Sequence, residues 1–256
     1  EVRRKFFGTL YNTYAFFALY ANIDKFAYQE PDLPIGGRPE IDRWIISLLN
    51  SLTQEVDSYY ADFEPTKAAR AIQLFVDEHL SNWYVRLCRR RFWKGDYTED
   101  KISAYQTLYT WLYLDLNGVT HNEQAESVHL ADFPAYHEDL MDKELEERMA
   151  LAQDISSLTL SLRKKTGINV RQPLNKILLP VLNADFRHKV EKVRELILSE
   201  TNIKEIEFIT DTAGFVTKKI KPNFKTLGPK VGKDMKAVAT AIQAFTPQDI
   251  ATLEGE

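Results

Sequence analysis

A stretch without glycine or proline extends from Thr66 to Lys94, between Pro65 and Gly95. Proline in the first turn of a helix and glycine just beyond its end are typical helix boundaries. The sequence therefore predicts one helix over residues 65–93. At 1.5 Å per residue, its roughly 29 residues would extend about 43 Å. A helix of this length with an apolar side needs other helices along it, so we expect a helical bundle.

Helices are predicted in four other parts of the first two thirds of the chain, the first two from apolar residues at helical spacing and the last two from residues typical of helix ends. The helices predicted there cover residues 1–23, 40–60, 98–117 and 142–166. A loop rich in proline and glycine fills residues 24–39, and residues 119–141 form a polar connector. We therefore assign residues 1–166 to the bundle.

The character of the sequence changes after Gly167. Runs of β-type residues at 176–182, 203–210 and 215–220, the last two joined by a turn at 211–214, accompany predicted helices over 185–200 and 233–245. Residues 167–256 are therefore expected to form a small α+β module, and the chain as a whole is expected to be mainly α-helical. A helix already in progress at residue 1 and a helix opening at Thr246-Pro247 indicate a piece of a longer protein.

The composition excludes several classes of protein. Of 256 residues, 44% are hydrophobic, and the formal net charge is −4, which is typical of a globular protein with a packed core. The single cysteine, Cys88, rules out an intramolecular disulfide framework, and no apolar run approaches the roughly 20 residues that span a membrane. Mild acidity argues against general affinity for nucleic acids, but it permits a local basic face.

The most informative motif is the segment Asn82–Lys94, which combines arginines and tryptophans. At 100° per residue, five of its side chains fall within about 120° of one another: Trp83, Arg86, Arg89, Arg90 and Trp93. Guanidinium groups bind phosphates and indole rings stack on unpaired bases, so this face predicts RNA binding, with Cys88 on the opposite side as a spectator. In the alternative, the arginines pair with nearby carboxylates such as Asp77, and the tryptophans fill the core.

Two further basic clusters follow in the sequence. The first consists of Arg163, Lys164, Lys165 and Arg171, and the first three of these occupy the last turn of a predicted helix, where the helix dipole favours positive charge without any ligand. The segment from Lys218 to Lys236 contains seven lysines and one aspartate, with glycines that bring backbone amides close to that charge. Such a segment suits an anion, and a solvated lysine face is the alternative.

Residues that could carry catalysis are poorly arranged. His121, His129 and His137 are spaced eight residues apart, which fits neither a helical nor a strand pair of metal ligands. We find no nucleophile-elbow, Walker-type or dinucleotide-binding motif, and Cys88 has no evident base partner. The residues therefore indicate binding, with no catalytic residue and no metal site in this chain.

Four segments resemble the isoleucyl-tRNA synthetase family. Residues 42–45 are similar to its DRWI helix opening, and residues 75–93 are similar to its anticodon-domain signature. Residues 170–174 resemble its VRQPL segment, and residues 221–230 resemble a KPNFKTLGPK segment typical of the branch that includes eukaryotic cytosolic enzymes. The first two motifs are shared in part with valyl and leucyl relatives, whereas the last two favour the isoleucyl enzyme.

The chain departs from the family pattern in two ways. The HIGH and KMSKS signatures that bind ATP are absent, and so is the inserted editing domain. Family members also carry a longer segment at the point where Trp111 runs directly into Leu112. The resemblance therefore implies the tRNA-binding region that follows the catalytic core, which by itself does not activate isoleucine.

The fold implied by the resemblance is a helical bundle of the class I synthetase anticodon-binding type, followed by the small α+β module. The implied function is recognition of the anticodon stem and loop of isoleucine tRNA, tRNA(Ile), within an isoleucine–tRNA ligase. Because related synthetases use their first bundle helix near the catalytic core, Arg4 and Asn12 join the expected RNA contacts. Lys225, Lys230 and Lys233 are expected to contribute from the third basic cluster.

The resemblance also implies cofactors and partners. This region is expected to need no cofactor, whereas the intact enzyme uses ATP and magnesium, and zinc is left open. The expected partners are tRNA(Ile) and the catalytic and editing domains of the same chain, in a cytoplasmic monomer without a membrane role. Two alternatives stay open at this point: a helical protein-interaction scaffold with no RNA role, and the same region of a valyl or leucyl relative.

Overall fold

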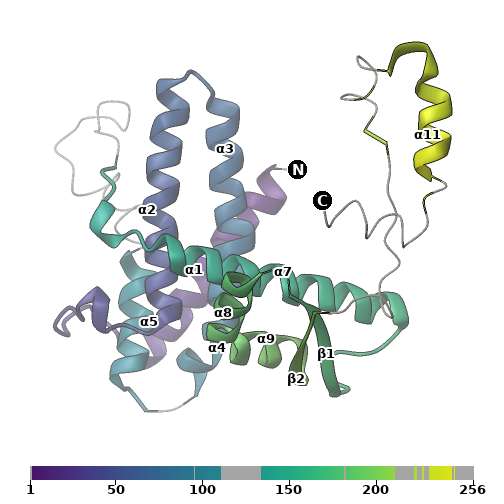
Figure 1. Ribbon diagram of the computed structural model, residues 1–256. Helices are drawn as coiled ribbons and strands as arrows, with labels where there is room; N and C mark the ends of the chain where they lie inside the picture. The colour runs from purple at the N-terminus through teal and green to yellow at the C-terminus, as the bar shows by residue number, and fades with distance from the viewer. Residues whose placement is uncertain are drawn as a thin grey trace. The chain divides into compact units, whose positions relative to one another are not determined.

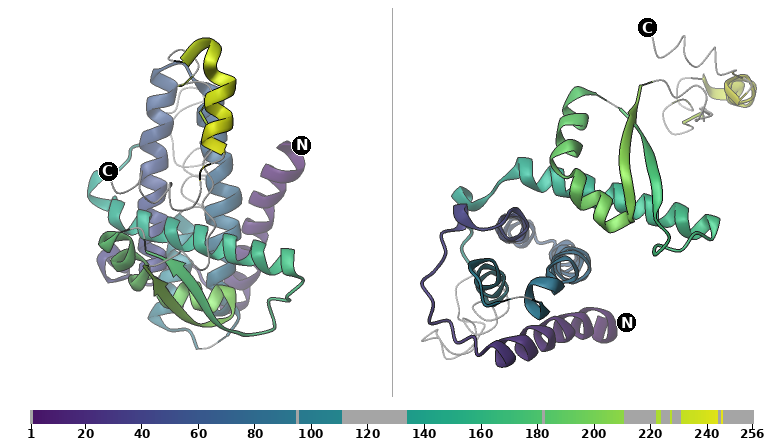
Figure 2. Two further views of the ribbon diagram at one scale, coloured as in Figure 1. Left: turned by 45° about the vertical axis from the view of Figure 1, so that its right-hand side comes forward. Right: turned by 90° about the horizontal axis from the view of Figure 1, so that it is seen from below.

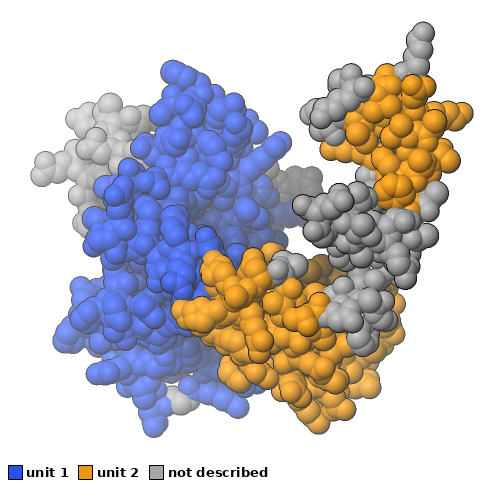
Figure 3. All heavy atoms as spheres, in the orientation of Figure 1, with its two compact units in different colours: residues 1–151 blue, residues 152–256 orange. Residues whose placement is uncertain are grey.

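The computed structural model describes residues 2–94, 96–110, 134–181, 183–210, 222–223, 227, 231–243 and 245 (Figure 1). These residues are mainly helical, as the sequence predicts, and they include a small two-stranded sheet. The chain divides into two compact units, Glu1–Leu151 and Ala152–Glu256 (Figure 3). This division falls inside helix α7, Lys143–Thr166, whereas the predicted domains meet at the end of that helix. The domain boundary after residue 166 stays a prediction.

Three helices of the first unit lie where the sequence predicts them. They are α1 (Val2–Asp24), α2 (Glu40–Ala61) and α5 (Glu99–Tyr109). Short 3-10 turns, η1 (Ile35–Gly37) and η6 (Glu138–Leu140), precede α2 and α7. The predicted continuation of α5 to residue 117 and most of the polar connector lie outside the described residues. The right-hand view of Figure 2 looks along α2 and α5, with α1 running across them.

The long helix predicted over residues 65–93 is one continuous helical run in three parts. α3 covers Pro65–Leu74, the π-helix η2 covers Phe75–Val85, and α4 covers Arg86–Trp93. A π-helix closes i→i+5 hydrogen bonds, so each residue turns by less than in an α-helix. The 11 residues of η2 therefore change which side chains share a face, compared with a uniform helical wheel.

Aromatic side chains from distant parts of the sequence form the core of the first unit. Tyr84, Phe92 and Tyr105 are each at most 1% exposed. The ring of Phe92 packs edge-on against Tyr105, with 5.0 Å between centroids, and against Phe16 at 5.2 Å. These contacts join α4 to α5 and to α1.

A buried carboxylate joins the same helices through hydrogen bonds. Asp42, in the first turn of α2, is completely buried. It accepts hydrogen bonds from the hydroxyls of Tyr84 at 2.8 Å and Ser103 at 2.5 Å, and from two nitrogens of Arg91 at 2.7 and 2.8 Å. A buried charge is costly unless it is paired and hydrogen-bonded. This network therefore positions the start of α2 against the helical run of residues 65–93 and against α5.

The second unit contains a two-stranded parallel sheet. Strand β1 (Leu174–Pro180) pairs with β2 (Ile203–Ile209). In this register, Leu174 lies opposite Ile203, and Pro180 lies opposite Ile209. Parallel strands need a crossover connection, and helices α8 (Ala184–Lys192) and α9 (Arg194–Thr201) lie within it. The single helix predicted over residues 185–200 is therefore two helices, separated at Val193, whose φ is −108° and ψ is 14°.

The last part of the second unit is described only in places. The 3-10 turn η7 (Gly232–Asp234) leads into helix α11 (Met235–Gln243), close to the predicted helix over 233–245. The predicted turn at 211–214, the predicted strand at 215–220 and the helix opening at Thr246-Pro247 lie outside the described residues.

Candidate nucleic-acid interface

Three arginines form an exposed face on α4, which we call the α4 basic face. Arg86, Arg89 and Arg90 are all exposed, and Arg86 is one helical turn from each of the other two. Like charges at these spacings repel each other by about 0.2–0.5 kcal/mol per pair. An anion bound at this face would remove that repulsion.

The arginines of the α4 basic face differ in their contacts. In the part of the chain that the structure describes, the guanidinium groups of Arg89 and Arg90 neither donate a hydrogen bond nor form an ion pair. Arg86 is held by its own helix, since its Nε donates to the carbonyl of Asn82 at 2.6 Å. Asp77, one of the carboxylates considered as a structural partner, instead accepts from Gln73 at 3.4 Å. Arg89 and Arg90 are therefore available for a ligand.

An aromatic ring accompanies these charges. Trp93, the last residue of α4, is 60% exposed. It follows Arg89 by four residues and Arg90 by three, spacings at which side chains on a helix are neighbours. The structure thus brings together two unpaired guanidinium groups and one exposed indole, which is the combination that binds phosphates and stacks on unpaired bases.

Trp83 does not belong to this face. Its side chain is only 6% exposed, and the guanidinium of Arg86 lies over its ring, 5.8 Å from the centroid. Trp83 lies in the π-helical segment η2, where a wheel of 100° per residue no longer applies. The prediction that Trp83 shares a face with Arg90 and Trp93 is therefore wrong, and its indole is part of the core.

The fourth arginine of the segment has a structural role that sequence reasoning missed. Arg91 binds both carboxylate oxygens of Asp42 and donates from Nε to Asp100 at 3.0 Å. Burial lowers the pKa of the Arg91 guanidinium, but the hydrogen bonds and charge of Asp42 outweigh this effect, and the pKa is raised. Its place one turn after Cys88, on the side opposite the predicted RNA-binding face, is the sequence signal that could have identified this role.

Cys88 lies in the core, on the side where the helical wheel places it. The residue is 1% exposed, and burial, with a further contribution from the charge of Asp42, raises the pKa of its thiol to about 12. A thiol with this pKa stays protonated at neutral pH, and a buried, protonated thiol is a poor nucleophile.

Comparison with known proteins assigns the segment that carries this face. Residues 42–116 match the family model of the anticodon-binding domain of tRNA ligase. The isoleucine–tRNA ligase of Bacteroides fragilis is 55% identical over 272 residues, covering 99% of this chain and 24% of the relative. The enzyme of Porphyromonas gingivalis is 53% identical with the same coverage, and that of Clostridium acetobutylicum is 37% identical, covering 98% of this chain and 25% of the relative.

The chain carries an isoleucine–tRNA ligase anticodon-binding domain. The family match begins at Asp42 and extends through α2, α3, η2, α4 and α5, so both the buried Asp42 network and the α4 basic face lie within the anticodon-binding domain. The chain spans about a quarter of the length of the relatives it matches, 24% of the Bacteroides fragilis enzyme. That alignment covers 272 positions, more than the 256 residues of this chain, so the relative contains residues without a counterpart here.

The other residues predicted to contact RNA are described only in part. Asn12 is exposed on α1, the helix that precedes the matched anticodon-binding domain. Arg4 also lies in α1 and Lys233 lies in η7, but their side chains are outside the description. Lys225 and Lys230 lie outside the described residues altogether. Of these five residues, only Asn12 is described with its side chain.

The second basic cluster has two different roles. Arg163 is only 2% exposed and donates to the backbone carbonyls of Asn169, Gln172 and Asn202 at 3.0–3.1 Å. These hydrogen bonds hold the turn after α7 close to the residue that precedes β2. The favourable interaction of Arg163 with the helix dipole is therefore not its only role. Its neighbours Lys164 and Lys165 are exposed, where the helix-dipole interpretation still applies.

Among the described residues, no group of three or more His, Cys, Asp or Glu side chains could hold a metal ion. His137 is described, whereas His121 and His129 are not. None of the helices that the structure describes is long and apolar enough to cross a membrane.

Proposed function

We propose that this chain binds the anticodon stem and loop of isoleucine tRNA, with Arg86, Arg89, Arg90 and Trp93 as its main contact. The observation that supports this most directly is a pair of guanidinium groups that have no partner among the described residues and lie beside an exposed indole, within an anticodon-binding domain. The arginines would hold phosphates, which positions the RNA. Trp93 would stack on an unpaired base of the loop.

The five residues outside the α4 basic face remain additional proposed contacts: Asn12, Arg4, Lys225, Lys230 and Lys233. Asn12 and Arg4 would reach the tRNA from α1. The three lysines would supply positive charge from the last part of the chain.

A salt-titrated binding assay with labelled isoleucine tRNA and the 256-residue chain tests the proposal. We expect the affinity to fall with salt concentration and to be higher for the native tRNA than for the same tRNA with a swapped anticodon. Equal affinity for the two tRNAs would contradict anticodon recognition. Absence of binding at low salt would contradict an RNA role altogether.

A protein-docking role is the second candidate, and the surface of α1 favours it. Residues 6–23 contain no charged side chain, yet Phe7, Tyr11 and Tyr14 are 57%, 69% and 45% exposed. Exposed apolar patches of this kind mark protein interfaces. In a longer isoleucine–tRNA ligase, this surface would contact the catalytic or editing domain, while the α4 basic face would bind tRNA.

The activity of a longer protein is also part of the proposal. Such a protein would attach isoleucine to its tRNA with ATP and magnesium, and a role for zinc is left open. The residues described here offer neither an ATP signature nor a metal cluster, so the chemistry would belong to residues outside this chain. We expect the isolated chain to show no isoleucine-dependent pyrophosphate exchange, and measurable exchange by the pure chain would contradict this.

Three finer assignments complete the proposal. The three relatives described above are bacterial, so membership of the branch that includes eukaryotic cytosolic enzymes depends only on the resemblance of residues 221–230. The protein is proposed to act in the cytoplasm and as a monomer, as the family resemblance implies.

A further inference from the structure

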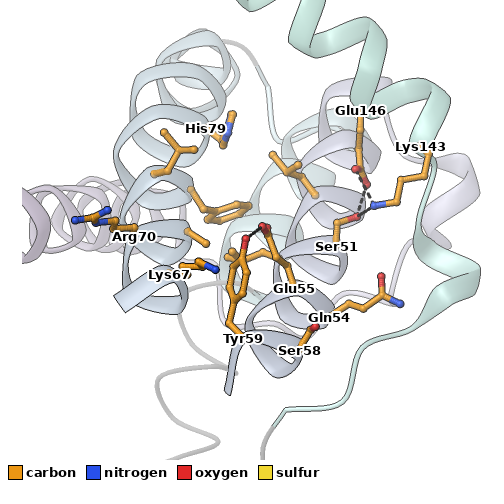
Figure 4. Close-up of a pocket in the computed structure, with 15 residues that line it drawn as sticks. Ser51, Gln54, Glu55, Ser58, Tyr59, Lys67, Arg70, His79, Lys143 and Glu146 are labelled. Atoms are coloured by element: carbon orange, nitrogen blue, oxygen red, sulfur yellow. Dashed lines mark hydrogen bonds and ion pairs between the residues drawn. The ribbon is translucent and has the colours of Figure 1, made fainter. Parts of the chain in front are cut away.

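A groove of about 890 Å³ lies between α2 and α3, away from the α4 basic face. This volume is in the range of sites that bind small molecules or single chemical groups. Leu52, Ala71 and Phe75 are among the apolar residues that line it, and most of the other lining side chains are polar (Figure 4). We call it the α2–α3 groove.

An oriented aromatic ring stands in this groove. The hydroxyl of Tyr59 donates to Glu55 at 2.6 Å, one helical turn earlier on α2, and this bond restrains the direction of the ring. Lys67, on the facing helix α3, lies over the ring with its Nζ 5.9 Å from the centroid. Figure 4 shows Lys67 reaching Tyr59 across the groove. A group stacked on Tyr59 would therefore lie beside a cation.

The charged groups of the groove differ in how far they are already paired. Glu55 accepts from Tyr59, and Glu146 accepts from Ser51 at 2.6 Å and from Lys143 at 3.2 Å. Arg70, by contrast, neither donates a hydrogen bond nor forms an ion pair in the described part of the chain. It points away from the groove along the outer side of α3 (Figure 4), one turn from Lys67. The rim at α3 thus carries two exposed cations, and only Lys67 has a carboxylate partner, Glu64 at 3.3 Å.

We propose that the α2–α3 groove receives one unpaired nucleotide of the bound RNA, with its base on Tyr59 and its phosphate beside Lys67, while Arg70 on the outer side of α3 faces the adjoining RNA backbone. The ring supplies a stacking surface that accepts any base, and the cations at the rim complement the charge of the RNA backbone. This inference depends on the proposed function, because it assigns a second contact to the same RNA ligand. It concerns residues of α2 and α3, whereas the principal contact is on α4.

The lining of the groove favours RNA over a protein helix as the occupant. Grooves that bind an amphipathic helix are lined mainly by apolar side chains that hold its buried face. Here hydroxyl and amide groups line the α2 side, including Ser51, Gln54 and Ser58, and the cations Lys67 and Arg70 line the α3 side. Groups of these kinds match the donors and acceptors on the edges of an unpaired base.

Four variants of the 256-residue chain test the inference by salt-titrated binding of isoleucine tRNA. Tyr59→Ala should weaken binding about tenfold, or ~1.4 kcal/mol, as expected for a lost stacking surface, without changing the salt dependence. Tyr59→Phe keeps the ring and should bind like the wild type. Arg70→Ala should flatten the salt dependence by a slope of about 0.7–0.9. Lys204→Ala, which removes an exposed charge from β2, is its matched control and should bind like the wild type.

The outcomes separate this inference from the proposed function. If the wild type binds tRNA through Arg89 and Arg90 but Tyr59→Ala and Arg70→Ala bind equally well, the groove has no RNA role and is left to a protein partner. If the wild type binds no tRNA, the proposed function fails, and this inference fails with it. Because Arg70 is exposed, its variant stays informative even if Tyr59→Ala unfolds, which thermal melting of each variant would reveal.

Discussion

Arg91 binds both carboxylate oxygens of the completely buried Asp42, at 2.7 and 2.8 Å. Its neighbours Arg89 and Arg90 have no such partner in the described part of the chain. The three consecutive arginines at residues 89–91 therefore have different roles. One stabilises the junction of α2 with the long helical run, and two face the solvent, where a ligand can reach them.

Replacing Arg91 should destabilise the first unit more than replacing Arg90. Arg91→Ala leaves the buried Asp42 carboxylate without its charge partner, which typically costs about 3–5 kcal/mol of unfolding free energy. Arg90→Ala changes an exposed side chain and should stay within about 0.5 kcal/mol. Urea unfolding of both variants measures the difference. Equal stability of the two variants would show that pairing with Arg91 does not stabilise the buried Asp42 carboxylate.

Replacing Arg89 or Arg90 should affect RNA binding and leave stability unchanged. Each Ala variant should weaken binding to isoleucine tRNA and to other tRNAs about equally, because phosphate contacts carry no base identity. The salt dependence should flatten by about 0.7–0.9 in slope for each lost contact. A loss confined to isoleucine tRNA would instead mean that these arginines read bases.

The two tryptophans of the segment should respond in opposite ways. Trp83→Ala truncates a side chain that is only 6% exposed and should cost about 3–5 kcal/mol of unfolding free energy. Trp93→Ala should keep the melting temperature but weaken tRNA binding by about 1–3 kcal/mol with an unchanged salt slope. Melting and binding measured on the same two variants decide this. Normal stability of Trp83→Ala would argue against its place in the core.

Cys88 should make the folded state sensitive to alkaline pH. Its pKa is about 12 in the folded chain against an ordinary value of 9.0. Above pH 9 the unfolded thiol therefore loses its proton while the folded thiol keeps it. This contribution to stability is complete below pH 9 and is lost as the pH rises towards 12, by up to ~1.4 kcal/mol per pH unit.

Urea unfolding of the wild type and Cys88→Ala at pH 8 and at pH 9.5 checks this dependence. The wild type should lose more stability than the variant over that interval, whereas parallel losses would contradict the buried neutral thiol. Cys88→Ala should bind tRNA like the wild type, because the residue is buried. A clear loss of binding by the folded variant would contradict its spectator role.

Local patterns were enough to predict most helices of this protein. Proline at residue 65 begins α3, and Gly167, with a φ of +72°, follows the end of α7. Hydrophobic spacing located α1 and α2 within a few residues, and Thr98 located the start of α5. These signals succeed because helix periodicity and helix ends depend on residues only a few positions apart. The same local signals also identified Arg89, Arg90 and Trp93 as exposed members of one face.

Tertiary structure alone decided which residues of the motif serve the fold. A uniform wheel could not show that residues 75–85 form a π-helix, and so it could not show that Trp83 is in the core. Nor could it show that Arg91 pairs with Asp42, 49 positions away. Sequence periodicity describes one helix at a time, whereas a buried charge is paired with whichever partner the packing of several helices brings to it. That packing separated the structural arginine from the two that stay exposed and unpaired in the described part of the chain.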